Sequence, residues 1–315
     1  LIVILLPRTM ILVSLLIMIL CKLGMASVTM CMYLQKSKHL SPLYSVILSV
    51  GFGMCAYGVI QTIDPMWLDG LVFLPLIALG VEYLVDDGRK LNYIIPLAMI
   101  CIANFYIGFM CCIFTAFYFF AYAFLATDKV KFRVDALAPV IGRMFAATAV
   151  AICLAAFMIL PIYNALSLGK FDFTTPDYSM KTQFSPLEFI AQLSINQYNS
   201  VNVEGKPEIY CGVLAFLTLP LFFCNTHIEY RKKLGYGFLC VIMFLSMWIK
   251  PLDMLWHGGQ VPNWLPFRYS FIFSFLFLSM AGMTLRAARG IKKPALFISA
   301  GAIVGIMFWA YSQKY

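Results

Sequence analysis

The sequence has 315 residues, of which 62% are hydrophobic and only 12% charged. Soluble domains carry about 25% charged residues, and half that share cannot cover a water-facing surface on a chain of this length. The composition therefore excludes a soluble enzyme, a disordered segment and a small disulfide-bonded domain, and it indicates an integral membrane protein. The cysteines form neither a CxxC pair nor a Cys/His cluster, so no metal site is expected.

A helix that crosses the hydrocarbon core needs about 20 mostly apolar residues. About ten apolar segments separated by short polar breaks predict an all-α, polytopic transmembrane protein with a single transmembrane domain, residues 1–315. The expected spans are residues 10–34, 42–60, 68–84, 91–104, 108–126, 142–162, 209–225, 234–250, 265–284 and 294–312. The fourth and fifth are separated at Asn104 to Gly108, where Asn and Gly favour a tight turn.

The distribution of Lys and Arg predicts the orientation of these spans. Most of these residues fall in one set of alternate breaks, such as Arg231-Lys232-Lys233, and cytoplasmic loops carry an excess of positive charge. Both ends of the chain are then expected outside the cell, as is the long loop at residues 163–208, with a short interfacial helix at Ser185–Leu193. The net charge of +9 is explained by topology and by attraction to anionic membrane lipid, so no nucleic-acid partner is expected.

The N-terminal boundary carries a further expectation. Residue 1 is Leu, and an apolar run followed by Pro7-Arg8 precedes the first full span. We therefore expect the chain to be part of a longer protein, with a preceding span and its outer loop lying outside this sequence.

Asp69 is the first candidate functional residue, at the start of the third expected span. A carboxylate there is favoured by the helix dipole alone. It could also lie at the edge of a cavity and act as a general base on a hydroxyl group.

The break between the eighth and ninth spans is the richest in polar side chains. Asp253 and His257 are four residues apart, so a helical turn would place them on one face. Arg268 could bind phosphate through its planar fork or extend to lipid headgroups. Together these residues predict a phosphate- or sugar-binding loop, to which Lys250, Asn263 and Tyr269 also belong.

Lys22 lies inside the first span, where a charge costs at least about 2.5 kcal/mol. Since no acidic residue is expected deep in any span, an anionic ligand or lipid headgroup is slightly favoured over a structural ion pair. Asn104 and Tyr106, at the expected turn, could also reach a headgroup, although aromatic residues there are more often packing residues.

Five segments in this order resemble the bacterial YfhO family of polytopic membrane proteins. They are Lys22–Ser27, Trp67–Leu76, Ile102–Met110, Pro251–His257 and Phe267–Phe271. The resemblance covers most of the chain, although no single motif is diagnostic.

The resemblance implies a GT-C glycosyltransferase core in a bacterial plasma membrane. Such an enzyme moves a sugar from a polyprenyl phosphate to an extracytoplasmic envelope polymer such as teichoic acid, and a separate glycosyltransferase and a flippase supply the donor. No other cofactor is implied, and a requirement for a divalent metal is left open. GT-C enzymes usually have an essential carboxylate in the first outer loop, which we expect to lie outside this sequence, so Asp69 and Asp253 are supporting or substitute candidates.

On this interpretation cationic groups bind the leaving phosphate while a carboxylate removes the acceptor proton. Arg268, His257 and Lys250 are the expected phosphate ligands, with Lys22 as a further candidate, and Asn263 and Tyr269 position the substrate. Two other functions stay open. A transporter or lipid flippase would need broken helices and paired charges near the midplane, and a non-catalytic scaffold for envelope assembly would need no site at all.

Overall fold

The computed structural model describes residues 7–127, 134–168, 178–195, 205–262 and 265–313. Within these ranges the chain is all-helical, apart from one isolated β-bridge between Thr182 and Ile249. The α-helices are α2 (Ile11–Lys36), α3 (Pro42–Gly53), α4 (Ala56–Ile60), α5 (Asp69–Asp86), α6 (Leu91–Ala103), α7 (Phe105–Phe120), α8 (Val134–Ser167), α9 (Pro186–Ala191), α10 (Val213–Cys224), α11 (Tyr230–Trp248), α12 (Lys250–Trp256), α13 (Phe271–Arg286) and α14 (Lys293–Gln313). Short helical turns are η1 (Arg8–Met10), η2 (Gln61–Ile63), η4 (Ala288–Gly290) and the π-helical η3 (Ala121–Ala126), which extends α7.

The predicted all-helical fold is confirmed, whereas the count of about ten spans is not. Among the described residues, four helices are long and apolar enough to cross a membrane: Ile11–Lys36, Phe105–Ala126, Leu137–Ser167 and Lys293–Ser312. The pair α3 and α4 adds a fifth if it is counted as one bent span. The other apolar segments form shorter helices or carry three charged residues, which are acidic in α5 and basic in α11.

The second expected span is not one straight helix. Its axis bends by 46° between α3 and the helical stretch that ends at Ile63. The bend brings the backbones of two glycines together, because a Cβ atom on Gly58 would lie 2.4 Å from the Gly53 carbonyl oxygen. The expected second span is therefore broken, a break that the sequence analysis did not predict.

The loop expected at residues 163–208 begins later than predicted, because α8 continues to Ser167. The short helix predicted within it at Ser185–Leu193 is present as α9. Ser185 caps that helix by accepting a hydrogen bond from the Glu188 amide, and the Glu188 side chain accepts one from the Ser185 amide. Both hydrogen bonds of a capping box are thus present, and they stabilise the N-terminus of this short helix.

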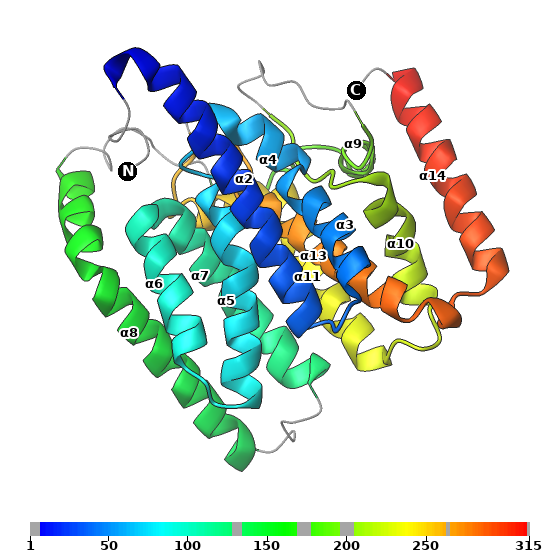
Figure 1. The fold of residues 1–315 in the computed structure, drawn as a ribbon, viewed down its shortest axis with the longest axis horizontal. Coiled ribbons are helices and arrows are strands. Elements are labelled where there is room, and N and C mark those ends of the chain that lie inside the picture. The colour runs from blue at the N-terminus through cyan, green and yellow to red at the C-terminus, as the bar shows by residue number, and fades with distance from the viewer. Residues whose placement is uncertain (1–6, 128–133, 169–177, 196–204, 263–264, 314–315) are drawn as a thin grey trace.

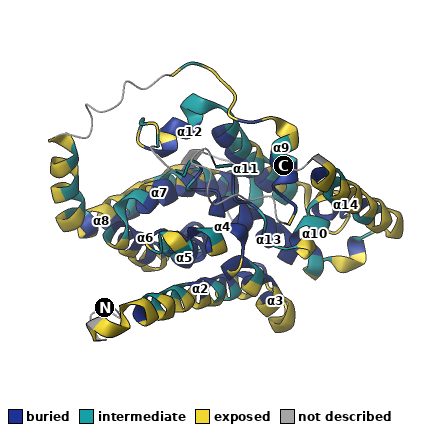
Figure 2. Cartoon of the chain, turned by 90° about the horizontal axis from the view of Figure 1, so that it is seen from above, coloured by how far each residue is buried: buried dark blue, intermediate teal, exposed yellow. Residues whose placement is uncertain are grey.

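The helices form a bundle in which α13 is central (Figure 1). α5 packs against α2, α6 and α7, while α10 packs between α13 and α14, and α8 lies against α6. Figure 2 shows the dark, buried α13 surrounded by α2, α3, α8 and α14, whose outward faces are exposed. Those faces carry large apolar side chains such as Leu12, Phe145 and Phe297, as a lipid-facing surface requires.

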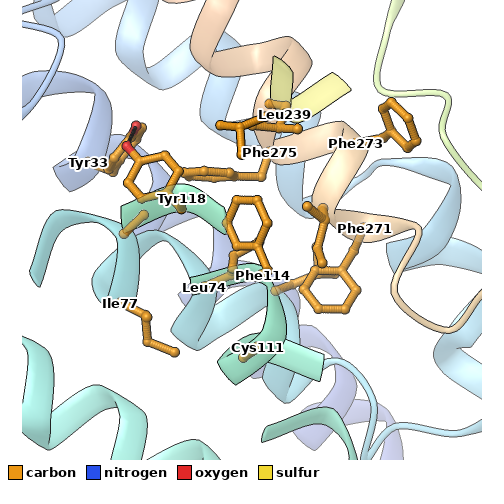
Figure 3. Close-up of a cluster of buried hydrophobic side chains, with 14 of the residues drawn as sticks. Tyr33, Leu74, Ile77, Cys111, Phe114, Tyr118, Leu239, Phe271, Phe273 and Phe275 are labelled. Carbon is orange, nitrogen blue, oxygen red and sulfur yellow. Dashed lines mark hydrogen bonds between the residues drawn. The ribbon is translucent and has the colours of Figure 1, made fainter. Parts of the chain in front are cut away.

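Aromatic rings fill the centre of the bundle (Figure 3). Phe275 of α13 lies between α2 and α7, with its ring centroid 4.8 Å from that of Tyr33 and 6.1 Å from that of Phe114. At the edge of this cluster the Tyr33 and Tyr118 hydroxyl groups meet at 2.8 Å. The core is therefore apolar in the middle and polar where these hydroxyl groups gather.

Those hydroxyl groups surround a buried ion pair. The Lys38 Nζ lies 2.9 Å from the Glu82 Oε1, and Tyr118 donates a 2.6 Å hydrogen bond to the same oxygen. Arg286 donates to the Lys38 carbonyl oxygen at 3.1 Å, which ties α13 to the same place. Glu82 lies two residues before the end of the third expected span and pairs with Lys38, not with Lys22.

The polar breaks gather at two ends of the bundle. We call them the Lys38 end, which holds the α2–α3 turn and the breaks after α5, η3, α10 and α13, and the Arg268 end, which holds the breaks before α5, α7, α10 and α13. At the Lys38 end Thr127 donates to Asp86, and Asn225 donates to the Ala287 carbonyl oxygen. These contacts agree with the predicted alternation of breaks between two sides. In Figure 1 the Arg268 end lies toward the top, where α2 starts and α14 ends.

Candidate functional site

The segment from Ile249 to Phe271 forms a short helix and a return to the bundle. Ile249 is extended and bridges to Thr182, and α12 follows directly with Pro251 in its first turn. Gly258 and Gly259 adopt positive φ angles of 70° and 80°, and Gly259 donates back to the Met254 carbonyl oxygen. The helix therefore stops after two turns and the chain reverses toward α13.

α12 brings Asp253 and His257 onto one face, as the spacing predicts. The His257 Nε2 lies 3.5 Å from the Asp253 Oδ1, without a hydrogen bond between them. Tyr269 donates a 2.8 Å hydrogen bond to the same oxygen, and its ring stacks on Trp256 with centroids 4.3 Å apart. Because Asp253 is only 2% exposed, it orients its neighbours from within the core.

Tyr106 connects α7 to this helix. Its hydroxyl group forms a hydrogen bond with the His257 Nδ1. Asn104 sets the position of Tyr106, since its side-chain oxygen accepts from the Tyr106 and Ile107 amides at 3.1 Å, and its nitrogen donates to the Met66 carbonyl oxygen at 3.2 Å. Asn104 thus caps α7 and joins the predicted turn to the break before α5.

Arg268 lies against two aromatic rings. Its guanidinium carbon is 4.6 Å from the Trp67 ring centroid and 5.2 Å from that of Tyr106, and its Nε donates to the Leu265 carbonyl oxygen at 3.1 Å. Leu265 and Phe267, which both precede Arg268 in the chain, have φ angles of 50° and 61°. Such left-handed conformations are strained for large side chains and persist where the surrounding structure imposes them, often at functional sites.

Lys22 has an acidic partner, contrary to expectation. Its Nζ lies 2.8 Å from the Asp69 Oδ1 and also donates to the Pro65 carbonyl oxygen at 2.9 Å. The two side chains are 16% and 15% exposed. Asp69 begins α5, next to the segment that carries Trp67, so the pair closes one side of the same polar region.

The structure therefore assembles most of the predicted residues at the Arg268 end. A chain of contacts links Lys22 and Asp69 through the break before α5 to Asn104 and Tyr106, and from there to Arg268, His257, Asp253 and Tyr269. Lys250 is the first residue of α12, and its amide donates to the Lys181 carbonyl oxygen at 3.0 Å. Asn263 lies outside the described residues.

Sequence reasoning missed several polar or aromatic residues at this end. Trp67 forms the platform under Arg268, and Gln61 bonds to Glu208, a buried carboxyl group. A glutamate directly before an apolar segment was the available signal for Glu208. In the part of the chain that the structure describes, no three His, Cys, Asp or Glu side chains are grouped to hold a metal ion.

Comparison with known proteins gives a family. The family model described as bacterial membrane protein YfhO matches residues 1–315. This chain belongs to the YfhO family. No curated protein and no solved structure matches it. The polar region at the Arg268 end is thus a feature of a YfhO-family membrane protein, and it contains the segments on which the resemblance rested.

Proposed function

We propose that this YfhO-family protein is a membrane glycosyltransferase. It transfers a sugar from a polyprenyl phosphate to an extracytoplasmic envelope polymer such as teichoic acid, in the plasma membrane of a bacterium. The donor reaches it from a separate glycosyltransferase and a flippase. The Arg268 end, like both ends of the chain, faces outward on this proposal.

One observation carries the proposal, namely the way Arg268 is held. Two aromatic rings and a backbone carbonyl group fix the plane of its guanidinium group, which presents a planar fork of donors. A fixed fork matches phosphate oxygens and stabilises the charge that develops on a leaving phosphate. His257 is bonded to the Tyr106 hydroxyl group through its Nδ1, and its Nε2, which has no hydrogen bond among the described residues, is the second nitrogen donor on this proposal.

The remaining residues have complementary roles. Lys250 and, as a further candidate, Lys22 add positive charge for the phosphate, while Tyr269, Asn263, Asn104 and Tyr106 position the substrate. Asp69 and Asp253 are the carboxylates that the sequence indicates as candidates for the base. Each has a strong partner, because Asp69 is paired with Lys22 and Asp253 accepts from Tyr269.

A transporter or lipid flippase is the second candidate. The bend between α3 and α4 and the buried Lys38–Glu82 pair are features that such a protein would need. The charges and hydroxyl groups around this ion pair are, however, bonded to one another. These bonds, with that of Arg286, join α2, α5, α7, α11 and α13 and do not line a path. A non-catalytic scaffold would leave the Arg268 arrangement without a role.

The test is sugar incorporation into envelope polymer by the full-length protein in cells. Arg268→Ala, Arg268→Lys, Asp69→Asn and Asp253→Asn are compared with the parent at equal membrane levels. Arg89→Ala is the matched control, because Arg89 also stacks on a tyrosine, with its guanidinium carbon 4.3 Å from the Tyr83 ring centroid, but lies at the Lys38 end.

We expect Arg268→Ala to lower incorporation about 100-fold or more, the usual effect of removing one group that stabilises developing charge. Arg268→Lys should recover little, since it keeps the charge and loses the planar fork. Arg89→Ala should behave as the parent. Parental incorporation in Arg268→Ala would refute the proposed site, and absence of transfer by the parent protein would refute the function.

A further inference from the structure

A third carboxyl group, Glu208, lies buried at the Arg268 end, in the irregular segment before α10. Its two oxygens accept hydrogen bonds from the Gln61 Nε2 at 3.0 and 2.8 Å. It is 9% exposed, and none of the described Lys, Arg or His side chains forms an ion pair with it. It therefore differs from Asp69 and Asp253, whose oxygens are held by a cation or a phenol.

The neighbouring Tyr57 has a buried hydroxyl group that is unusual in the same way. The side chain is 0% exposed, and its oxygen has no hydrogen-bond partner among the described residues. Buried polar atoms are nearly always bonded, and an exception calls for a ligand, a water molecule or a catalytic role.

The local backbone holds these groups in place. The Ala56 amide donates to the Tyr210 carbonyl oxygen at 2.8 Å, which fastens the segment carrying Glu208 to the start of α4. The Tyr57 ring packs on Phe271, with centroids 5.1 Å apart, at the N-terminal end of α13. The segment before α10 carries the Glu208 carboxyl group, and α4 carries the Tyr57 hydroxyl group, which has no partner among the described residues. Both are fastened near the N-terminal end of α13, which directly follows the segment that carries Arg268.

The chemistry of Glu208 suits proton removal from an alcohol. A carboxylate offers about four acceptor positions, of which the Gln61 amide uses two. Burial raises the pKa of Glu208 to about 8, against a smaller opposite effect of the Gln61 hydrogen bond. A base is most effective when its pKa lies near the working pH, which an exposed carboxylate cannot achieve.

We propose that Glu208 is the general base of the transferase site and that the Tyr57 hydroxyl group binds the same acceptor oxygen. This assignment rests on the proposed function. The acceptor hydroxyl group gives its proton to the Glu208 carboxylate as its oxygen forms a bond to the anomeric carbon. The bond from that carbon to the phosphate oxygen breaks, and its electron pair leaves with the polyprenyl phosphate at Arg268. The proton then passes from Glu208 to water.

The experiment uses the full-length protein in lipid nanodiscs with a polyprenyl-phosphate sugar and a soluble fragment of the envelope polymer. Glu208→Gln keeps the shape of the side chain and removes its basicity, and Tyr57→Phe removes only the hydroxyl group. Glu188→Gln is the matched control, since Glu188 lies in the same outer part of the chain but pairs with Lys206 at 2.8 Å. Transfer rate, its pH profile and binding of the donor alone are measured for each variant.

We expect Glu208→Gln to slow transfer by about 100-fold to 10,000-fold while donor binding stays at the parental value. The parental rate should rise as the pH increases toward 8, and this rise should be absent in the variant. Tyr57→Phe should slow transfer less, with its effect on the KM for the acceptor. Arg268→Ala should instead weaken donor binding.

The outcomes separate the two proposals. Parental transfer by Glu208→Gln overturns the assignment of the base and leaves the proposed function standing. Absence of transfer by the parent overturns the proposed function. If Glu208→Gln accumulates poorly, Glu208→Asp decides the matter, because a shifted pH profile supports the assignment and an unchanged profile and rate overturn it.

Discussion

The Lys22–Asp69 pair yields the most direct stability prediction. Its atoms are 2.8 Å apart, and both side chains are about five-sixths buried in a largely apolar bundle. At an effective dielectric constant of about 20, this separation corresponds to an attraction of about 6 kcal/mol, from which the cost of removing both charges from water must be subtracted. Breaking such a pair on one side typically costs about 3–5 kcal/mol, because the other charge is left buried and unpaired.

We therefore expect Lys22→Met and Asp69→Asn each to destabilise the protein by about 3–5 kcal/mol, and the double variant to be more stable than the sum of the two losses predicts. Thermal unfolding in nanodiscs, analysed as a double-mutant cycle, measures the coupling energy. The exposed pair Glu229 and Lys232, at 3.1 Å, is the control and should give less than about 1 kcal/mol. Additive losses at Lys22 and Asp69 within about 0.5 kcal/mol would refute the reasoning.

The same variants decide the role of Asp69. If Asp69 only neutralises Lys22, the double variant should recover sugar transfer together with stability. If Asp69 takes part in the reaction, the double variant should accumulate in the membrane and still fail to transfer sugar. Both activities are compared with the parent at equal protein level.

Three further predictions concern other parts of the molecule. Asn104→Ala removes the two cap bonds of α7 and should lower stability by about 1 kcal/mol in thermal unfolding. Glu82→Gln leaves the buried Lys38 charge without its partner and should cost about 3–5 kcal/mol, so an unchanged melting temperature would contradict the role of the pair. Burial raises the pKa of Glu208 from 4.5 to about 8 in the folded protein, so the charged form of Glu208 opposes folding. The parent should therefore lose up to about 5 kcal/mol of stability relative to Glu208→Gln as the pH rises from about 4.5 to 8. A constant difference in melting temperature between the two proteins across this range would contradict the raised pKa.

The helices could be predicted from the sequence because their cause is local. Apolar residues in runs bounded by polar breaks must form helices where no water is present to bond the backbone. The turn at Asn104 was likewise readable, since Asn caps the following helix through its own side chain. The bend at Gly53 and Gly58 could not be predicted from the sequence, because it depends on the close approach of two backbone segments once α3 and α4 have packed.

Part of the candidate site could be predicted from the sequence, because some of its contacts form between residues close together in the chain. Asp253 and His257 share a helical turn, so their spacing alone brings them together. Tyr106 and His257 lie in different helices, and only packing of α7 against α12 joins them. The sequence indicated which side chains were unusual in a membrane chain and left their partners open.

The sequence by itself thus determined an all-helical membrane protein with polar groups collected at the ends of its helices, since hydrophobicity and helix periodicity act over neighbouring residues. Tertiary structure alone decided that Lys22 faces Asp69, that Lys38 and Glu82 form a buried pair, and that Glu208 lies beside Gln61. These pairs form between residues far apart in the chain, and the cost of leaving a polar group unpaired in an apolar interior selects them only when the helices have packed.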